Sequence, residues 1–197
     1  TKAMAEREVL SENGPDLATV ALRPHLIWGP GDTHIVPGIV ARGRQGQLRR
    51  IGKQDKLVDF TYIDNAVEAH LCAARKLGRG SPISGKKYFI SDGKPVWLWG
   101  FINQILNAAG VPPVQKSISP RVAYMAGQVF ESVYRLLRLR GEPRLTRFLA
   151  EELSTAHWFD ISAAREELGY RPRVRLEEDL EKLSEWLGGA DRGPARN

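Results

Sequence analysis

Short apolar runs alternate with stripes of apolar residues at helical spacing along much of the chain. The run 17–22 has the length of a buried strand, and the β-branched and aromatic residues of 57–63 favour another, as do those of 87–91. Helical spacing predicts seven helices, over 2–12, 35–41, 64–77, 97–109, 121–140, 161–168 and 176–188. This order of elements is typical of an α/β chain with parallel strands.

Capping residues mark the ends of several predicted helices. We expect Asp64 to cap the helix over 64–77 and Asp160 to cap the one that stops at Gly169. The apolar stripe of the first of these helices consists of Val67, Leu71, Ala74 and Leu77. The last helix begins with acidic residues, and the tail 188–197 is expected to be disordered.

The number of predicted strands is small for a complete nucleotide-binding fold. Only three or four are convincing, whereas a doubly wound sheet usually has more. Its nucleotide site usually follows the first strand, but the first predicted element here is a helix. We therefore expect the chain to be the second half of a longer α/β protein.

The composition is that of a globular protein, with 42% hydrophobic and 26% charged residues. The one cysteine, Cys72, excludes an intrachain disulfide and fits a reducing compartment, so we expect a cytoplasmic location. Charges among the first ten residues argue against a signal peptide. The longest uncharged run, 95–115, is broken by glycine, proline and amide residues, so no membrane span is expected.

The net charge of +6 is concentrated in two basic clusters, over 42–56 and 135–147. No aromatic residues interleave the first cluster and no nucleic-acid-binding motif accompanies it, so we expect no nucleic-acid partner. The segment 121–140 combines an apolar side with arginines at its end. Two interpretations stay open: peripheral membrane contact, or a lid helix facing substrate or core. Gln128 and Glu131 dilute its apolar stripe and favour the lid.

Several familiar motifs are incomplete. The segment 80–87 nearly matches a phosphate-binding loop, but a helix precedes it, a strand follows it, and the final hydroxyl residue is missing. The stretch 29–31 lacks the third glycine of a dinucleotide fingerprint. The histidines are scattered and no G-x-S-x-G is present, so neither a metal site nor a serine nucleophile is expected.

Four segments, in order, resemble the second half of an extended short-chain dehydrogenase/reductase. They are 1–6, the arginine-proline to glycine-aspartate stretch 22–32, the Asp-Phe-Thr-Tyr-Ile-Asp-Asn-Ala stretch 59–66, and 159–172 with the helix start that follows it. The resemblance implies an α/β fold: the second half of a Rossmann-type parallel sheet with a mostly helical substrate-binding subdomain.

The 3β-hydroxysteroid dehydrogenase group is the most similar part of that superfamily. The segments 57–62 and 145–148 carry this similarity, and 21–32 is especially similar to a bacterial branch that reduces long 2-alkyl-3-oxo acids. Sugar-nucleotide epimerases commonly have an arginine where this chain has Val58. The absence of that fork-shaped donor weakens, without eliminating, a nucleotide-sugar substrate.

The resemblance also implies site residues. The family's tyrosine donates a proton, and a lysine four residues later lies on the same helix face and lowers the tyrosine's pKa. Lys2 matches this catalytic lysine, which also bonds the nicotinamide ribose of NAD or NADP; the tyrosine would precede Thr1. Pro24 and the backbone of Leu26 and Ile27 match the stretch that holds the nicotinamide amide.

Other candidate residues are less specific. Trp28, His34 and Arg49 are candidates for substrate contact, and Trp28 is equally compatible with simple packing. Tyr62 is expected in a strand core. The implied boundaries are a core end over 1–28, a substrate-domain insertion over 29–56, a return to the core over 57–91 and a C-terminal substrate-binding subdomain over 92–187.

The function implied is an NAD(P)-dependent oxidoreductase that interconverts a secondary alcohol and a ketone on a hydrophobic substrate, either a sterol or a long-chain 2-alkyl-3-oxo acid. The full-length protein is expected to be a homodimer. The chain alone is expected to be inactive and poorly stable, because its first strand lacks sheet neighbours. Two alternatives stay open: a nucleotide-sugar epimerase or dehydratase, and a non-catalytic truncated module.

Overall fold

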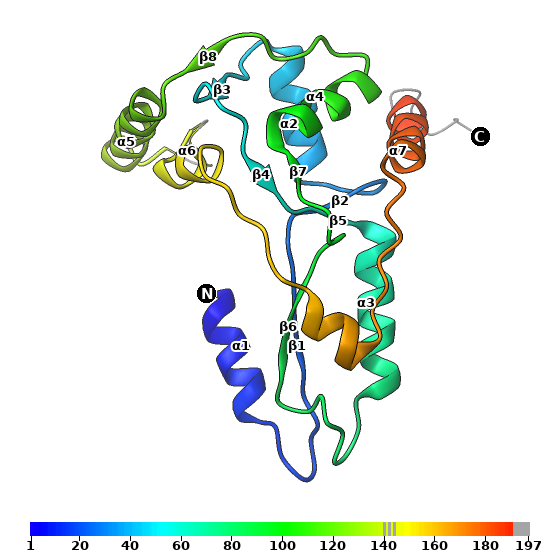
Figure 1. The fold of residues 1–197 in the computed structure, drawn as a ribbon. Coiled ribbons are helices and arrows are strands. Elements are labelled where there is room, and N and C mark those ends of the chain that lie inside the picture. The colour runs from blue at the N-terminus through cyan, green and yellow to red at the C-terminus, as the bar shows by residue number, and fades with distance from the viewer. Residues whose placement is uncertain (140, 142, 144, 191–197) are drawn as a thin grey trace, which may run out of the picture. The chain divides into compact units, whose positions relative to one another are not determined.

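The computed structural model describes residues 1–139, 141, 143 and 145–190, which pack as two units (Figure 1). The first unit contains 1–35, 59–95 and the described chain from Trp158 onward. The second contains 36–58 and 96–157. Each unit is therefore assembled from segments that are distant in the sequence.

The first unit is built around two parallel strand pairs. Its elements are α1 (Lys2–Ser11), β1 (Ala21–Pro24), β2 (Ile27–Trp28), β5 (Thr61–Tyr62), α3 (Ile63–Lys76), β6 (Lys87–Ile90), the π-helix η1 (Ala164–Leu168) and α7 (Leu176–Ala190). β1 pairs with β6, Leu22 lying opposite Tyr88, and β2 pairs with β5. α1 lies on one side of the β1–β6 pair, and α3 and η1 lie on the other (Figure 1). The predicted α/β class with parallel strands is confirmed.

The core of this unit forms where α3 and η1 approach the strands. Small side chains on α3 meet large ones from β6 and the η1 region, and Tyr170 is fully buried with its hydroxyl donating to the Ser91 carbonyl at 3.1 Å. The buried cluster consists of Ala69, Cys72, Ala73, Ile83, Tyr88, Ile90, Ile161, Ala164, Leu168 and Tyr170. Small helix residues allow the close approach that native packing density requires.

The prediction for α3 was wrong about which face is buried. Val67 and Leu71, expected in the apolar stripe, are 51% and 44% exposed, because the helix turns its alanines and Cys72 toward the strands. Asp64 is not the N-cap: Tyr62 occupies that position, and Asp64 lies in the first turn.

Buried polar groups connect the ends of the strands. The Thr61 hydroxyl is fully buried and donates to the His25 carbonyl at 2.7 Å, with the Ile90 carbonyl 3.2 Å away. The Asp92 carboxylate accepts the Tyr62 backbone N–H at 3.0 Å and the Asn65 side-chain amide at 2.7 Å. Since buried polar groups must be hydrogen-bonded, these contacts fix three distant segments to one another.

The second unit is mostly helical. Its elements are α2 (Ile35–Arg44), β3 (Arg50–Ile51), β4 (Leu57–Val58), β7 (Val96–Trp97), α4 (Leu98–Ala108), β8 (Ser117–Ile118), α5 (Pro120–Leu136) and α6 (Arg147–Glu152). β3 pairs in parallel with β8, and β4 pairs antiparallel with β7. Most buried residues of α4 are large and apolar, and a β-carbon at Gly43 of α2 would lie 2.5 Å from Leu106. Glycine at that position lets the two helices pack closely.

The helix α5 leaves most of its apolar side chains exposed. It contacts α6 through its small residues: Ala123 and Gly127 are buried, and a β-carbon at Gly127 would lie 2.7 Å from the Arg147 nitrogen. The predicted amphipathic helix is present, but its apolar side does not enter the core of this unit. No helix among the described residues is long and apolar enough to cross a membrane.

Some element boundaries differ from the predictions. The first strand begins at Ala21 rather than at 17, and the predicted strand 57–63 is two short strands separated by Asp59 and Phe60. The helix α7 continues to Ala190, so the disordered tail does not begin at 188; residues 191–197 lie outside the described part of the chain.

The Asp92 carboxyl predicts a pH dependence of stability. Burial raises its pKa from 3.8 to about 6, although hydrogen bonds from Asn65 and the Tyr62 backbone lower it. The folded state therefore binds this proton more readily than the unfolded state, so the group's contribution to the unfolding free energy falls as pH rises from about 4 to about 6 and then levels off.

The test compares urea unfolding of the wild type and of Asp92→Asn between pH 4 and 7. The unfolding free energy of the wild type, relative to the variant, should fall by roughly 2 kcal/mol across that window. A difference that does not change with pH would contradict the assigned titration.

Candidate functional site

The turn between β1 and β2 has an unusual backbone. Leu26 has a φ of +44°, in the left-handed region that residues with a β-carbon rarely adopt. The Leu26 carbonyl accepts the Thr61 backbone N–H at 3.3 Å, and the preceding carbonyl, that of His25, accepts the Thr61 hydroxyl. Such backbone strain persists only where neighbouring contacts hold it. Here β5 supplies those contacts.

The residues after this turn, Trp28 and Gly29, pack closely against β5 and the start of α3. Trp28 is 1% exposed, and its ring packs edge to face on that of Tyr62, with centroids 5.2 Å apart. Gly29 has a φ of +137°, and a β-carbon there would lie 2.8 Å from Ile63 Cγ2. Only glycine fits this position. The stretch from Pro24 to Gly29 is thus fixed against the start of α3.

An ion pair fastens α1 to β1. The Arg23 guanidinium bonds the Glu6 carboxylate through two nitrogens, Nε to Oε2 at 2.6 Å and Nη2 to Oε1 at 2.5 Å. The hydrogen bond from Arg23 lowers the pKa of Glu6, opposed by a smaller effect of burial. A two-pronged contact fixes orientation as well as distance. The first turn of α1, which carries Lys2, is therefore held relative to the strand that ends at Pro24.

The residues expected at the site are distributed over both units. Lys2 is exposed in the first turn of α1, and Pro24 ends β1. His34 is exposed, and its backbone N–H donates to Asp32 Oδ1 at 2.7 Å. Arg49 belongs to the second unit, where its Nη1 donates to the Gly46 and Leu48 carbonyls at 2.6 and 2.7 Å. The first unit by itself brings together α1, the 24–29 stretch and β5.

Sequence reasoning missed the residues that hold this arrangement. Thr61 and Asp92 fix the backbone around Leu26 and β5, and Glu6 pairs with Arg23. A threonine between aromatic residues in an apolar strand was a usable signal, because a buried hydroxyl needs a carbonyl partner. The spacing of Glu6 and Arg23 in the sequence carried no comparable signal.

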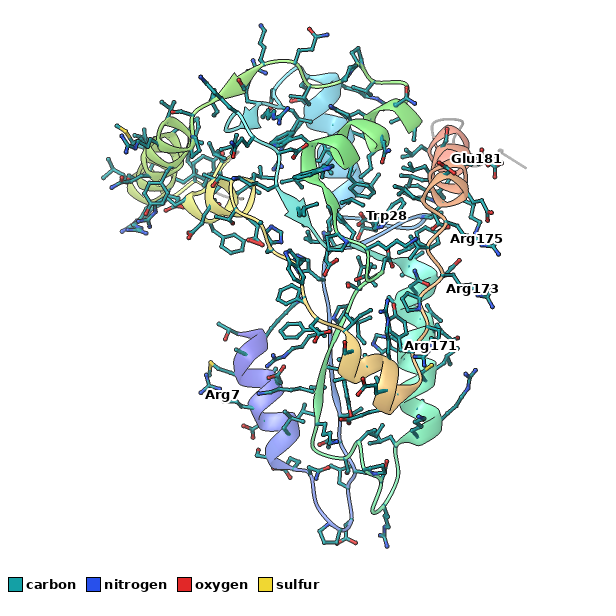
Figure 2. The ribbon with its side chains drawn as sticks, viewed as in Figure 1. Arg7, Trp28, Arg171, Arg173, Arg175 and Glu181 are labelled. Carbon is teal, nitrogen blue, oxygen red and sulfur yellow. The ribbon has the colours of Figure 1, made fainter. Side chains whose placement is uncertain are left out.

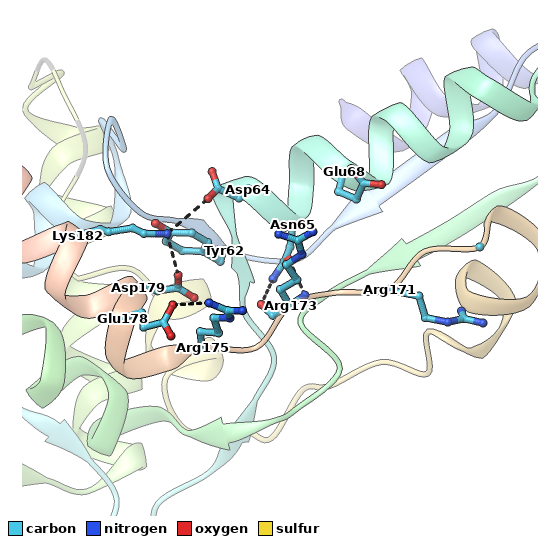
Figure 3. A pocket seen from close by; sticks show the side chains of 11 residues that line it. Tyr62, Asp64, Asn65, Glu68, Arg171, Arg173, Arg175, Glu178, Asp179 and Lys182 are labelled. Carbon is cyan, nitrogen blue, oxygen red and sulfur yellow. Dashed lines mark hydrogen bonds and ion pairs between the residues drawn. The ribbon is translucent and has the colours of Figure 1, made fainter.

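A second polar region lies between α3 and α7, in a cavity of about 470 Å³ (Figure 3). The ammonium group of Lys182 is 4.0 Å from Asp64 and 3.8 Å from Asp179, and it lies 5.7 Å from the centroid of the Tyr62 ring. Burial, with the nearby carboxylates of Asp179 and Asp64, raises the pKa of Tyr62 to about 12. Tyr62 therefore stays protonated at neutral pH, and its expected position in a strand core is confirmed.

Three arginines alternate along the segment that leads into α7. Arg173 and Arg175 project outward from it (Figure 2), whereas the Arg171 guanidinium donates to the Arg165 carbonyl at 2.7 Å. Arg175 pairs with Glu178 at 2.9 Å. The Asn65 side chain accepts the Arg173 backbone N–H at 2.9 Å and donates to the Arg173 carbonyl at 3.0 Å. The carboxylates of this cavity that lie on α7 have cationic partners, which makes the region a surface ion-pair network that joins α3 to the C-terminal segment.

Comparison with known families shows which family the chain belongs to. The sequence pattern of the 3-beta hydroxysteroid dehydrogenase/isomerase family matches residues 1–120, more than half of the chain. The chain belongs to this family. The match includes α1, the 24–29 stretch, β5 and α3. The contacts described above for this part of the first unit therefore lie within the matched residues.

Named relatives agree with this membership. A 2-alkyl-3-oxoalkanoate reductase of Stenotrophomonas maltophilia is 52% identical over 93% of this chain and 56% of the relative. A decarboxylating sterol-4-alpha-carboxylate 3-dehydrogenase of Saccharomyces cerevisiae is 37% identical over 95% of this chain and 55% of the relative. The chain spans about half the length of the curated relatives it matches.

Solved structures show the same fold. An epimerase from Methanothermobacter thermautotrophicus, 16% identical, superposes with a TM-score of 0.65 over 97% of this chain and 49% of that structure. The resemblance to the 3β-hydroxysteroid dehydrogenase group and the predicted Rossmann-type α/β class are confirmed. The family shown by the sequence and the fold shown by the solved structures are therefore consistent with each other.

The Glu6–Arg23 ion pair predicts how firmly α1 is held. Arg23→Lys keeps the positive charge but removes the fork, so α1 should separate from β1 more often. We expect amide hydrogen exchange over residues 5–11 to become several-fold faster while exchange in α3 is unchanged. As the pH falls below the ordinary pKa of Glu6 and through its lowered value, the wild type should approach the variant, because protonating the carboxylate removes the same contact.

The matched control is Arg75→Lys, which alters an exposed 3.4 Å contact with Glu68 on α3. This variant should leave exchange in α1 unchanged. Equal exchange in α1 for the wild type and Arg23→Lys would show that the pair does not hold the helix.

Proposed function

We propose that the protein from which this chain comes is an NAD(P)-dependent oxidoreductase that interconverts a secondary alcohol and a ketone on a hydrophobic substrate. One observation carries the proposal: a lysine-bearing helix is clamped by Glu6 and Arg23 to the strand that ends in the rigid 24–29 stretch. The named dehydrogenase and reductase relatives support the same chemistry.

The residues of this chain have specific roles in that reaction. Lys2 stabilises the ionised form of a tyrosine that lies outside this sequence, lowering a pKa that is normally about 10, so that the tyrosine can give a proton to the carbonyl oxygen. Pro24 and the backbone of Leu26 and Ile27 position the nicotinamide amide. When bound, the nicotinamide cofactor supplies the hydride.

The backbone that would contact the nicotinamide is held in one conformation, and this supports binding of the cofactor. Thr61 holds the His25 and Leu26 carbonyls through its hydroxyl and backbone N–H, so the groups beyond them keep one conformation. A pre-formed contact surface avoids the cost of ordering the chain on binding. Whether the nucleotide is NAD or NADP depends on residues outside this chain.

The substrate class is the finer part of the proposal. A long-chain 2-alkyl-3-oxo acid or a sterol is supported by the names of the relatives and by Val58, a fully buried aliphatic side chain where epimerases commonly have an arginine. The substrate-binding parts are 29–56 and 92–187, with Trp28, His34 and Arg49 as candidate contacts. Nucleotide-sugar chemistry and a non-catalytic module are the alternatives, and the full-length protein is proposed to be a homodimer.

Replacing Lys2 tests the chemical role directly. In the full-length protein, Lys2→Met should lower kcat/KM for ketone reduction by about 10²–10⁴-fold, because the proton donor loses the charge that lowers its pKa. The pH at which activity is half-maximal should rise as well. Lys94→Met, at another exposed lysine of the same unit, is the control and should leave both quantities unchanged.

Three results would overturn the proposal. Full activity in Lys2→Met would remove the lysine from the mechanism. Failure of the unaltered full-length protein to bind either dinucleotide would favour the non-catalytic alternative. Turnover of UDP-sugars without turnover of sterols or 3-oxo acids would favour the epimerase alternative.

The exposed face of α5 supports a peripheral membrane location, which suits a hydrophobic substrate. Met125, Val129 and Leu136 are 64%, 60% and 82% exposed, and large exposed apolar patches mark interaction surfaces. Arg135 and Arg138 lie at the end of this face, which gives it the charge that anionic lipid attracts.

Vesicle flotation of the full-length protein tests this location. Binding should require phosphatidylglycerol in the vesicles, and reversing both Arg135 and Arg138 to Glu should weaken it by roughly tenfold or more. Val129→Glu should weaken it too, whereas Val67→Glu, at a similarly exposed valine on α3, should not. Equal binding of all variants, or none by the wild type, would contradict the membrane location.

A further inference from the structure

A groove of about 720 Å³ opens in the second unit, between the end of α2 and the loop that joins α4 to β8. Its volume lies in the range of small-molecule sites. Arg44, Arg49 and Lys116 line it, and among the described residues no acidic side chain does. The described lining of the groove is therefore positively charged.

The parallel pairing of β3 and β8 places two of these cations side by side. Arg50 lies opposite Ser117, so Arg49 and Lys116 are neighbours immediately before the paired residues. Like charges directly across a strand pair are destabilising. An anion between them would turn this repulsion into two favourable contacts.

The Arg49 guanidinium is already oriented at the groove. Its Nη1 donates to the Gly46 and Leu48 carbonyls at 2.6 and 2.7 Å, which holds the side chain in one place. A guanidinium has five N–H donors, so this anchoring leaves others to bind a ligand. Fixed donors lose little conformational entropy when they bind.

The acidic residue nearest in sequence to Arg49 has hydrogen-bond partners outside the groove. Within the basic stretch 42–56, Asp55 is the only acid. Its carboxylate accepts the backbone N–H groups of Trp99 and Gly100 at 3.0 and 3.2 Å, at the start of α4. The partial negative charge at the end of α2 favours Arg44, but it does not account for Lys116 beside Arg49.

Part of the groove lining is apolar. It consists of 111–114, a Val-Pro-Pro-Val stretch in which Val111 is 6% exposed. We propose that this groove binds an organic phosphate, with the phosphate between Arg49 and Lys116 and the carbon skeleton of the ligand along 111–114. Charge-assisted hydrogen bonds from arginine and lysine are the usual means of phosphate recognition.

Isothermal titration calorimetry on the full-length protein, at fixed ionic strength, tests the site with three probes: inorganic pyrophosphate, uridine diphosphate and dihexanoyl phosphatidic acid. We expect saturable binding, weakened about tenfold by Arg49→Gln and by Lys116→Gln. Lys53→Gln removes an exposed lysine of the same basic stretch that does not line the groove, and should leave affinity unchanged. The two organic probes should bind more tightly than pyrophosphate, and the tighter one identifies the ligand class.

Sulfate is titrated as a further control. Three outcomes would overturn the site: no saturable binding of any phosphate probe, an affinity for sulfate equal to that for the phosphate probes, or equal weakening by Lys53→Gln and Lys116→Gln. Thermal unfolding with and without the tightest probe shows whether each variant is folded. Because the titration needs no turnover, its failure would leave the proposed oxidoreductase activity untouched, and loss of that activity would leave the groove untouched.

Discussion

The buried hydrogen bonds of β5 and its neighbours are the constraint on which the rest of the first unit depends. Thr61, fully buried, contacts carbonyls at the ends of both β1 and β6, and Asp92 accepts the backbone N–H of Tyr62, the N-cap of α3. Burying these groups without partners would cost far more than the bonds gain. Their mutual satisfaction therefore dictates one arrangement of the strand ends, including the left-handed Leu26.

That arrangement extends outward to the residues that carry the proposed chemistry. The turn held by β5 ends the strand to which Arg23 fastens α1, so Lys2 and the backbone after Pro24 are positioned by connected contacts within one unit. A catalytic lysine on a helix that moved freely would lose most of its effect, because proton transfer depends on distances of a few tenths of an ångström. The exposed position of Lys2 is compatible with contact to a group outside this chain.

The sequence predicted the element types well, and it predicted packing less well. Local patterns sufficed for α1, α4 and β6, whose predicted ends lie within one residue of the observed ones. They failed for α3, where Val67 and Leu71 dominate the apolar pattern but the alanines face the strands, because close packing favours small residues there. The contacts of Thr61, Asp92 and Arg23 join residues 17 to 36 positions apart, a distance at which no periodicity carries information.

The most direct test of the central claim is the rate of NADH and NADPH oxidation by the full-length protein with a long-chain 2-alkyl-3-oxo acid, measured beside UDP-glucose at equal concentration. The account predicts saturable oxidation of one dinucleotide that depends on the 3-oxo acid, with none above background for the nucleotide sugar. No oxidation with 3-oxo acids or 3-oxo sterols, in a protein that is folded and binds the dinucleotide, would contradict it.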